Sequence, residues 1–94
     1  MIRVLICDDQ TVVRDGLEAI LSTDDELEVI GVARNGQEAL DLARERHPDV
    51  VLMDLKMPVL DGVQTTARLR RAQPEARVLI LTTYAHDTWV LDAI

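Results

Sequence analysis

Carboxylate side chains follow two of the apolar runs in this sequence, and their positions indicate a cation site. Asp8 and Asp9 come directly after residues 4–7, and Asp54 comes directly after residues 50–53. If these runs are neighbouring strands of a parallel sheet, their carboxyl ends share one edge and the three carboxylates converge there. Two such charges about 4 Å apart repel by about 4 kcal/mol at an effective dielectric constant of about 20. The cluster therefore calls for proton uptake or a cation.

Mg²⁺ fits the predicted cluster because it binds carboxylate and carbonyl oxygens and keeps positions for water and for phosphate oxygens. Zinc is not indicated, because no set of cysteine and histidine ligands competes: we expect His47 near a helix C-terminus and His86 in a loop. After residues 78–81, Thr82 could donate a hydrogen bond to a phosphoryl oxygen on Asp54. We therefore interpret the cluster as a phosphoryl site.

Each of these residues also has a simpler interpretation. Asp9 could cap the following helix, Asp8 and Asp54 could be solvated strand ends, and Thr82 could bond to nearby backbone. For any one residue alone the simpler interpretation is favoured. The functional interpretation depends on all of them meeting in one crevice.

The elements that must position these residues follow from the hydrophobic pattern. Four apolar runs are typical of strands, at residues 4–7, 27–33, 50–53 and 78–81. Apolar residues at helical spacing follow each run: Val13, Leu17, Ile20 and Leu21; Ala39, Leu40 and Ala43; Val63 and Ala67; Val90, Ala93 and Ile94. This alternation predicts an α/β fold, a doubly wound parallel sheet with helices on both faces. Residues 27–33 include a charge and a glycine, as edge strands do, which predicts the strand order 2-1-3-4.

The composition limits the function classes that fit. The formal net charge of −7 repels a phosphate backbone, so we expect no direct binding of nucleic acid. The single cysteine, Cys7, lies in an apolar run and is consistent with a reducing cytoplasm. No apolar run approaches the roughly 20 residues that cross a bilayer, so we expect no membrane span. Without a visible linker, residues 1–94 are predicted to be one domain.

The sequence resembles bacterial two-component receiver domains along its whole length. The matching residues are Asp8-Asp9, Asp54 followed by Pro58 and Asp61-Gly62, and Thr82. The stretches around Asp8, Asp54 and Thr82 are similar to the subgroup that carries a LuxR-type helix-turn-helix output domain. The resemblance implies the flavodoxin-like receiver topology.

The resemblance also implies a role for each matching residue. Asp54 would be the phosphoacceptor, which receives a phosphoryl group from a sensor histidine kinase or from a small acyl phosphate. Asp9 and Asp54 would bind Mg²⁺ together with the backbone carbonyl of Lys56, Asp8 would hold a metal-bound water, and Thr82 would bind the phosphoryl group. Such a domain is cytoplasmic, promotes its own phosphorylation and dephosphorylation, and acts on DNA only through an output domain.

The sequence departs from the family at its C-terminal end. Receiver domains continue with a fifth strand and a fifth helix, and a family lysine at the end of that strand pairs with the phosphoryl oxygens. Lys56 is the only lysine here, and its position supplies the carbonyl ligand. We therefore expect residues 1–94 to be a receiver domain without its fifth strand, fifth helix and output domain. We also expect self-association, through the edge of the fourth strand or by exchange of the last helix.

Three other classes compete with a phosphorylation switch. A receiver-like domain that no longer transfers phosphate could act purely as a protein-binding module, and Mg²⁺ titration would separate the two. A nucleotide- or flavin-binding fold is disfavoured because no glycine-rich loop follows residues 4–7. A phosphatase with two aspartates separated by one residue is disfavoured because Asp8 and Asp9 are adjacent and point to different sides.

Overall fold

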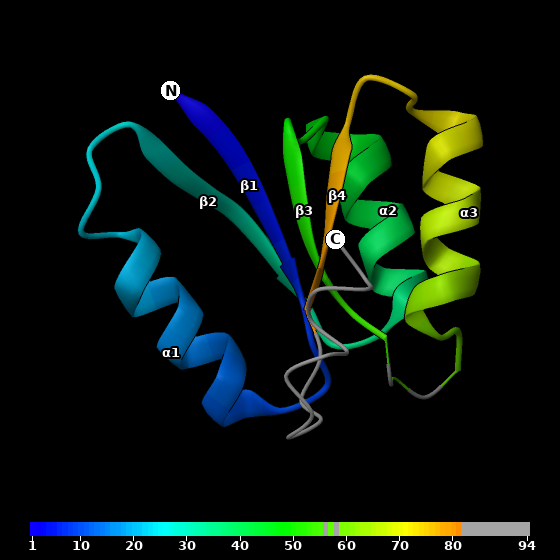
Figure 1. Ribbon diagram of the computed structural model, residues 1–94, viewed down its shortest axis with the longest axis horizontal. Coiled ribbons are helices and arrows are strands. Elements are labelled where there is room, and N and C mark those ends of the chain that lie inside the picture. The colour runs from blue at the N-terminus through cyan, green and yellow to red at the C-terminus, as the bar shows by residue number, and fades with distance from the viewer. Residues whose placement is uncertain (56, 58, 82–94) are drawn as a thin grey trace.

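The computed structural model describes residues 1–55, 57 and 59–81 (Figure 1). Strands and helices alternate along this part of the chain: β1 (Ile2–Cys7), α1 (Thr11–Leu21), β2 (Leu27–Ala33), α2 (Gly36–Arg46), β3 (Val50–Asp54), α3 (Gly62–Ala72) and β4 (Arg77–Leu81). The helical pattern predicted at residues 90–94 lies outside the described residues. None of the described helices is long and apolar enough to cross a membrane.

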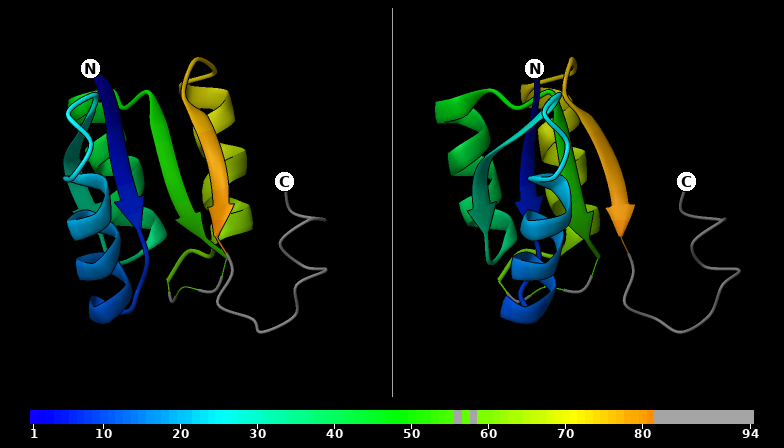
Figure 2. Two further views of the ribbon diagram at one scale, coloured as in Figure 1. Left: turned by 60° about the vertical axis from the view of Figure 1, so that its left-hand side comes forward. Right: turned by 90° about the vertical axis from the view of Figure 1, so that its left-hand side faces the viewer.

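The four strands form one parallel sheet in the order β2-β1-β3-β4. The predicted fold class and strand order are confirmed, including the position of β2 at an edge. Helix α1 lies on one face of the sheet, and α2 and α3 lie on the other (Figures 1 and 2). The helices therefore cover both faces, as the crossover connections of a doubly wound sheet require.

The core forms around the two central strands. Its buried members come from β1, β3, the end of β2, helices α2 and α3, and the loop after β3: Leu5, Cys7, Ala33, Ala39, Ala43, Val51, Met53, Met57 and Leu69. None of these side chains is aromatic, and most are aliphatic, which suits the packing of helices on a sheet. Ile20 and Val63 belong to the predicted helical repeats, yet they remain 68% and 64% exposed to solvent.

The starts of the helices differ in how they are capped. The side chain of Asn35 accepts a hydrogen bond from the backbone N–H of Glu38 at the start of α2. Asp61 forms a reciprocal capping box with Gln64 at the start of α3. By contrast, α1 begins after Gln10, whose side chain makes no capping hydrogen bond. The simpler interpretation of Asp9 as the cap of this helix is therefore wrong.

Candidate functional site

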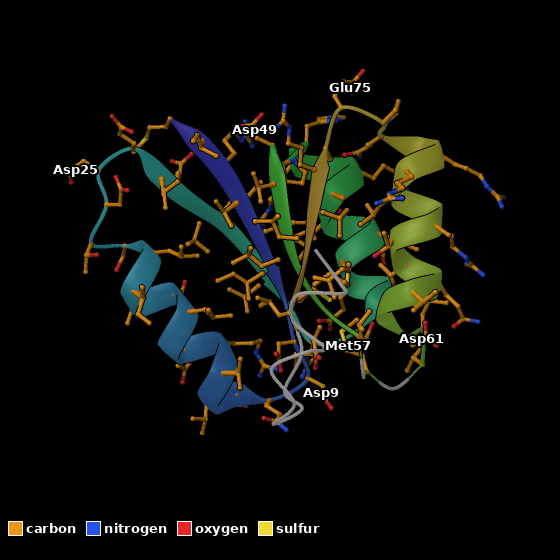
Figure 3. All side chains as sticks on the ribbon, in the orientation of Figure 1. Asp9, Asp25, Asp49, Met57, Asp61 and Glu75 are labelled. Atoms are coloured by element: carbon orange, nitrogen blue, oxygen red, sulfur yellow. The ribbon has the colours of Figure 1, made fainter. Side chains whose placement is uncertain are left out.

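Three carboxylates meet at the edge of the sheet where β1 and β3 end. One ligand oxygen from each of Asp8, Asp9 and Asp54 can be chosen so that all three lie within 4.8 Å of one another. The cause is the parallel register, in which Cys7 of β1 is paired with Met53 of β3, so that the residues that follow leave the sheet side by side. Figure 3 shows Asp9 at the end of the sheet where the strand arrows point, opposite the end that carries Asp49.

The three carboxylates differ in their exposure to solvent. Asp8 is fully buried and Asp54 is 2% exposed, whereas Asp9 is exposed. One oxygen of Asp8, Oδ1, accepts a hydrogen bond of 2.9 Å from the backbone N–H of Gln10. The other oxygen, Oδ2, is buried and has no hydrogen-bond partner among the described residues. A buried carboxylate oxygen without a donor is costly, so a cation or a proton at this atom would be stabilising.

The pKa of Asp8 reflects this environment. Burial raises the pKa of its carboxyl group, and the negative charge of Asp9 adds to the increase. The hydrogen bond from the backbone of Gln10 and the positive charge of Arg14 act in the opposite direction. The donor set is made only of oxygen atoms and carries negative charge, as a hard divalent cation requires. The residues present therefore fit Mg²⁺.

A glycine brings the start of α3 against the end of β3. The N–H of Gly62 donates a 3.0 Å hydrogen bond to the carbonyl of Leu55. A Cβ atom at Gly62 would lie 2.2 Å from the carbonyl oxygen of Asp54, which is closer than real contacts allow. Gly62 therefore lets the backbone fold back over the end of β3. The sequence pattern predicts only a connector at Asp61-Gly62. A glycine directly after a helix-capping residue is the signal that could have indicated this close backbone contact.

Cys7 directly precedes the carboxylate cluster in β1, and its thiol is unreactive. Its side chain is buried, and Sγ lies 3.2 Å from Sδ of Met57. Burial, with smaller contributions from the charges of Asp8 and Asp54, raises the pKa of the thiol to about 12. Since the thiolate is the reactive form, the structure supports the interpretation of Cys7 as a packing residue.

Sequence reasoning gives no role to Arg14, which the structure places beside the carboxylates. Its guanidinium group donates hydrogen bonds to the carbonyl of Asp8 and to the hydroxyl of Thr11. The available signal is a cation one helical turn after a pair of adjacent aspartates. His47 is the C-cap residue of α2, so it lies at the helix C-terminus as predicted. Thr82, Lys56 and His86 lie outside the described residues, so the roles of Thr82 and Lys56 stay predictions.

The chain is similar in sequence to one known family and to several longer proteins. The response regulator receiver domain family matches residues 4–94. The transcriptional regulatory protein LnrK of Bacillus subtilis (strain 168) is 46% identical over 94 residues, which are 100% of this chain and 43% of that protein. The response regulator GacA of Pseudomonas aeruginosa is 45% identical over 87 residues, 93% of this chain and 41% of GacA. The chain thus spans less than half the length of these relatives.

Solved structures share the fold. The signal receiver domain of the putative response regulator NarL from Mycobacterium tuberculosis superimposes with a TM-score of 0.85 at 35% identity, over 98% of this chain and 74% of that domain. The response regulator domain of CheB from Thermotoga maritima gives a TM-score of 0.86 at 32% identity, over 93% of this chain and 64% of that one. Both similarities extend over nearly all of the chain.

Proposed function

Because the chain belongs to the response regulator receiver domain family, we propose that Asp54 accepts a phosphoryl group in a Mg²⁺-dependent reaction. The donor is the phosphohistidine of a sensor histidine kinase or a small acyl phosphate. One observation carries the proposal: three carboxylates lie within 4.8 Å of one another, and a buried oxygen of Asp8 has no partner among the described residues. Such a cluster is expensive without a cation and is suited to binding one.

The carboxylate of Asp54 acts as the nucleophile. A carboxylate oxygen attacks the phosphorus, the bond between phosphorus and the donor's nitrogen or oxygen breaks, and water later hydrolyses the resulting acyl phosphate. Asp9, Asp54 and the backbone carbonyl of Lys56 would hold Mg²⁺, and Asp8 would hold one of its water ligands. When bound, the metal supplies positive charge that offsets the charge on the phosphoryl oxygens.

Phosphorylation then acts as a switch in the whole protein. In this proposal the hydroxyl of Thr82 binds the phosphoryl group and reports it, because a switch needs a contact that differs between its two states. One relative, LnrK, is a transcriptional regulatory protein more than twice as long as this chain, which supports a DNA-binding output domain in the whole protein. We also propose that the whole protein is cytoplasmic.

The test of this proposal is intact-mass measurement after incubation with acetyl phosphate, with and without Mg²⁺. We expect a gain of one phosphoryl group only when Mg²⁺ is present, and no gain in Asp54→Ala or Asp9→Ala. The matched control is Asp15→Ala, an exposed aspartate on α1, which should be phosphorylated like the unmodified chain. A gain that survives Asp54→Ala contradicts the assignment of the phosphoacceptor. No gain in the unmodified chain would favour a module that only binds proteins.

A further inference from the structure

Arg14 ties together the segment that carries two of the three carboxylates. Its Nη1 donates a 2.8 Å hydrogen bond to the carbonyl of Asp8, and its Nη2 donates a 2.9 Å hydrogen bond to the hydroxyl of Thr11. Its backbone N–H donates a 3.0 Å hydrogen bond to the carbonyl of Gln10. One residue thus bonds to the positions on both sides of Asp9, and the loop between β1 and α1 is held at both ends.

Apart from the hydrogen bond from the N–H of Gln10 to Oδ1 of Asp8, few interactions hold the start of α1 in place. Helices α2 and α3 begin with a side-chain cap, whereas Gln10 makes no such bond. The first turn of α1 contains no acidic residue, and no residue of the helix is buried. A helix without a cap or a buried residue depends more on the remaining tethers at its start. The guanidinium of Arg14 is such a tether, and its side chain is half-buried.

We propose that Arg14 is a positioning residue for the metal site, and that its two-armed bridge from Asp8 to Thr11 holds Asp8 and Asp9 in the geometry that binds Mg²⁺. This inference rests on the proposed Mg²⁺-dependent function of the site. Mg²⁺ requires nearly ideal octahedral geometry, and a binding constellation must be held to within about 0.5 Å. Asp9 is exposed and sits in a loop, so its own packing does not supply that precision.

Charge and geometry predict opposite effects of removing Arg14. As a positive charge beside the cluster, Arg14 repels a divalent cation, so a neutral replacement would tighten Mg²⁺ binding if charge alone mattered. As a bridge, Arg14 preorganises the ligands, so the same replacement weakens binding. The planar guanidinium reaches two acceptors at once, and a lysine ammonium at the same place is a point charge on a flexible stem. Arg14→Lys therefore keeps the charge and removes the bridge.

The experiment is a calorimetric Mg²⁺ titration of the 94-residue chain, without a phosphoryl donor, for Arg14→Lys, Arg14→Gln and Thr11→Val. We expect Arg14→Lys to bind Mg²⁺ about tenfold more weakly, as loss of a residue that orients metal ligands typically does. Arg14→Gln should also bind more weakly than the unmodified chain, but by less, because it removes a charge that repels the cation. Thr11→Val, which removes one arm of the bridge, should weaken binding less. It should add little to Arg14→Lys, because the bridge is already lost there. The matched control is Arg34→Gln, which removes an exposed arginine paired with Glu38 and should leave the affinity unchanged.

The outcomes separate the possible failures. The bridge is overturned if Arg14→Lys binds Mg²⁺ with unchanged affinity, or if Arg14→Gln binds it more tightly. The proposed function still stands in that case, provided that the unmodified chain binds Mg²⁺ and is phosphorylated. No saturable Mg²⁺ binding by the unmodified chain overturns both this inference and the proposed function. Thermal unfolding without metal measures folding separately. If the Arg14 variants do not fold, Thr11→Val decides, because it changes only an exposed hydroxyl: weaker binding supports the bridge, and unchanged binding overturns it.

Discussion

Asp8 holds a buried carboxylate at the end of β1, and burial raises its pKa above the usual value of 3.8. A carboxyl group whose pKa is higher in the folded state binds more protons folded than unfolded, between its unfolded and folded pKa values. The free energy of unfolding therefore falls as the pH rises through that window. Above that window the metal-free protein carries the full cost of the buried charge.

Asp8→Asn should therefore stabilise the metal-free protein at neutral pH and weaken Mg²⁺ binding. The amide keeps an oxygen for the N–H of Gln10 and places an N–H donor beside the other two carboxylates. We expect the midpoint of thermal unfolding to rise at about pH 7, and this gain to shrink as the pH falls toward about 4. Asp15→Asn on α1 is the matched control and should show little change. A variant less stable than the unmodified protein at neutral pH would contradict this account.

At the scale of the elements, replacement by alanine is expected to have opposite effects on stability at two glycines. In Gly62→Ala the new Cβ would meet the backbone of Asp54 at 2.2 Å, so α3 must move away from β3. We expect destabilisation of about 1–3 kcal/mol, as overpacking usually costs, together with slower phosphorylation of Asp54. Chemical denaturation measures the first effect and intact mass over time measures the second.

Gly16→Ala is the control for that change, because Gly16 lies inside α1 and a methyl group there would meet, among the described residues, no heavy atom from outside its own helix within 4 Å. Alanine is favoured over glycine in a helix by about 1 kcal/mol. Gly16→Ala should therefore stabilise the protein, or leave it unchanged, without slowing phosphorylation. Equal destabilisation by both substitutions would show that the contact of Gly62 with Asp54 is not the cause.

At the scale of the whole molecule, β4 is the last strand of the described sheet. None of its residues is buried, and Leu79 is 51% exposed. No other strand among the described residues pairs with its outer edge. Exposed apolar edges of this kind favour pairing with another chain.

We therefore expect the 94-residue chain to self-associate, which light scattering coupled to size-exclusion chromatography measures. Leu79→Lys places a charge on β4 and should reduce association, since lysine on an edge strand opposes pairing. Val12→Lys, at an exposed position of α1, is the matched control and should leave association unchanged. If the unmodified chain is monomeric at high concentration, the edge of β4 does not pair with another chain.

The sequence alone was enough to predict the order of the elements and the edge of the sheet at which the carboxylates meet. Apolar runs of strand length alternate with helical repeats, and parallel strands place Asp8, Asp9 and Asp54 at their common carboxyl edge. These conclusions depend on local periodicity and on general rules for parallel sheets. They need no knowledge of how particular side chains pack.

Only the tertiary structure decided how the site is built. Asp8 is buried and Asp9 is exposed, and α1 begins after Gln10. Gly62 lies close to the backbone of Asp54, and Arg14 bridges the loop between β1 and α1. Each feature depends on the angle at which a helix leaves its strand and on contacts between residues distant in the chain. The sequence predicts that the two adjacent aspartates point to different sides. Only the folded protein shows that Asp8 is the buried one and Asp9 the exposed one.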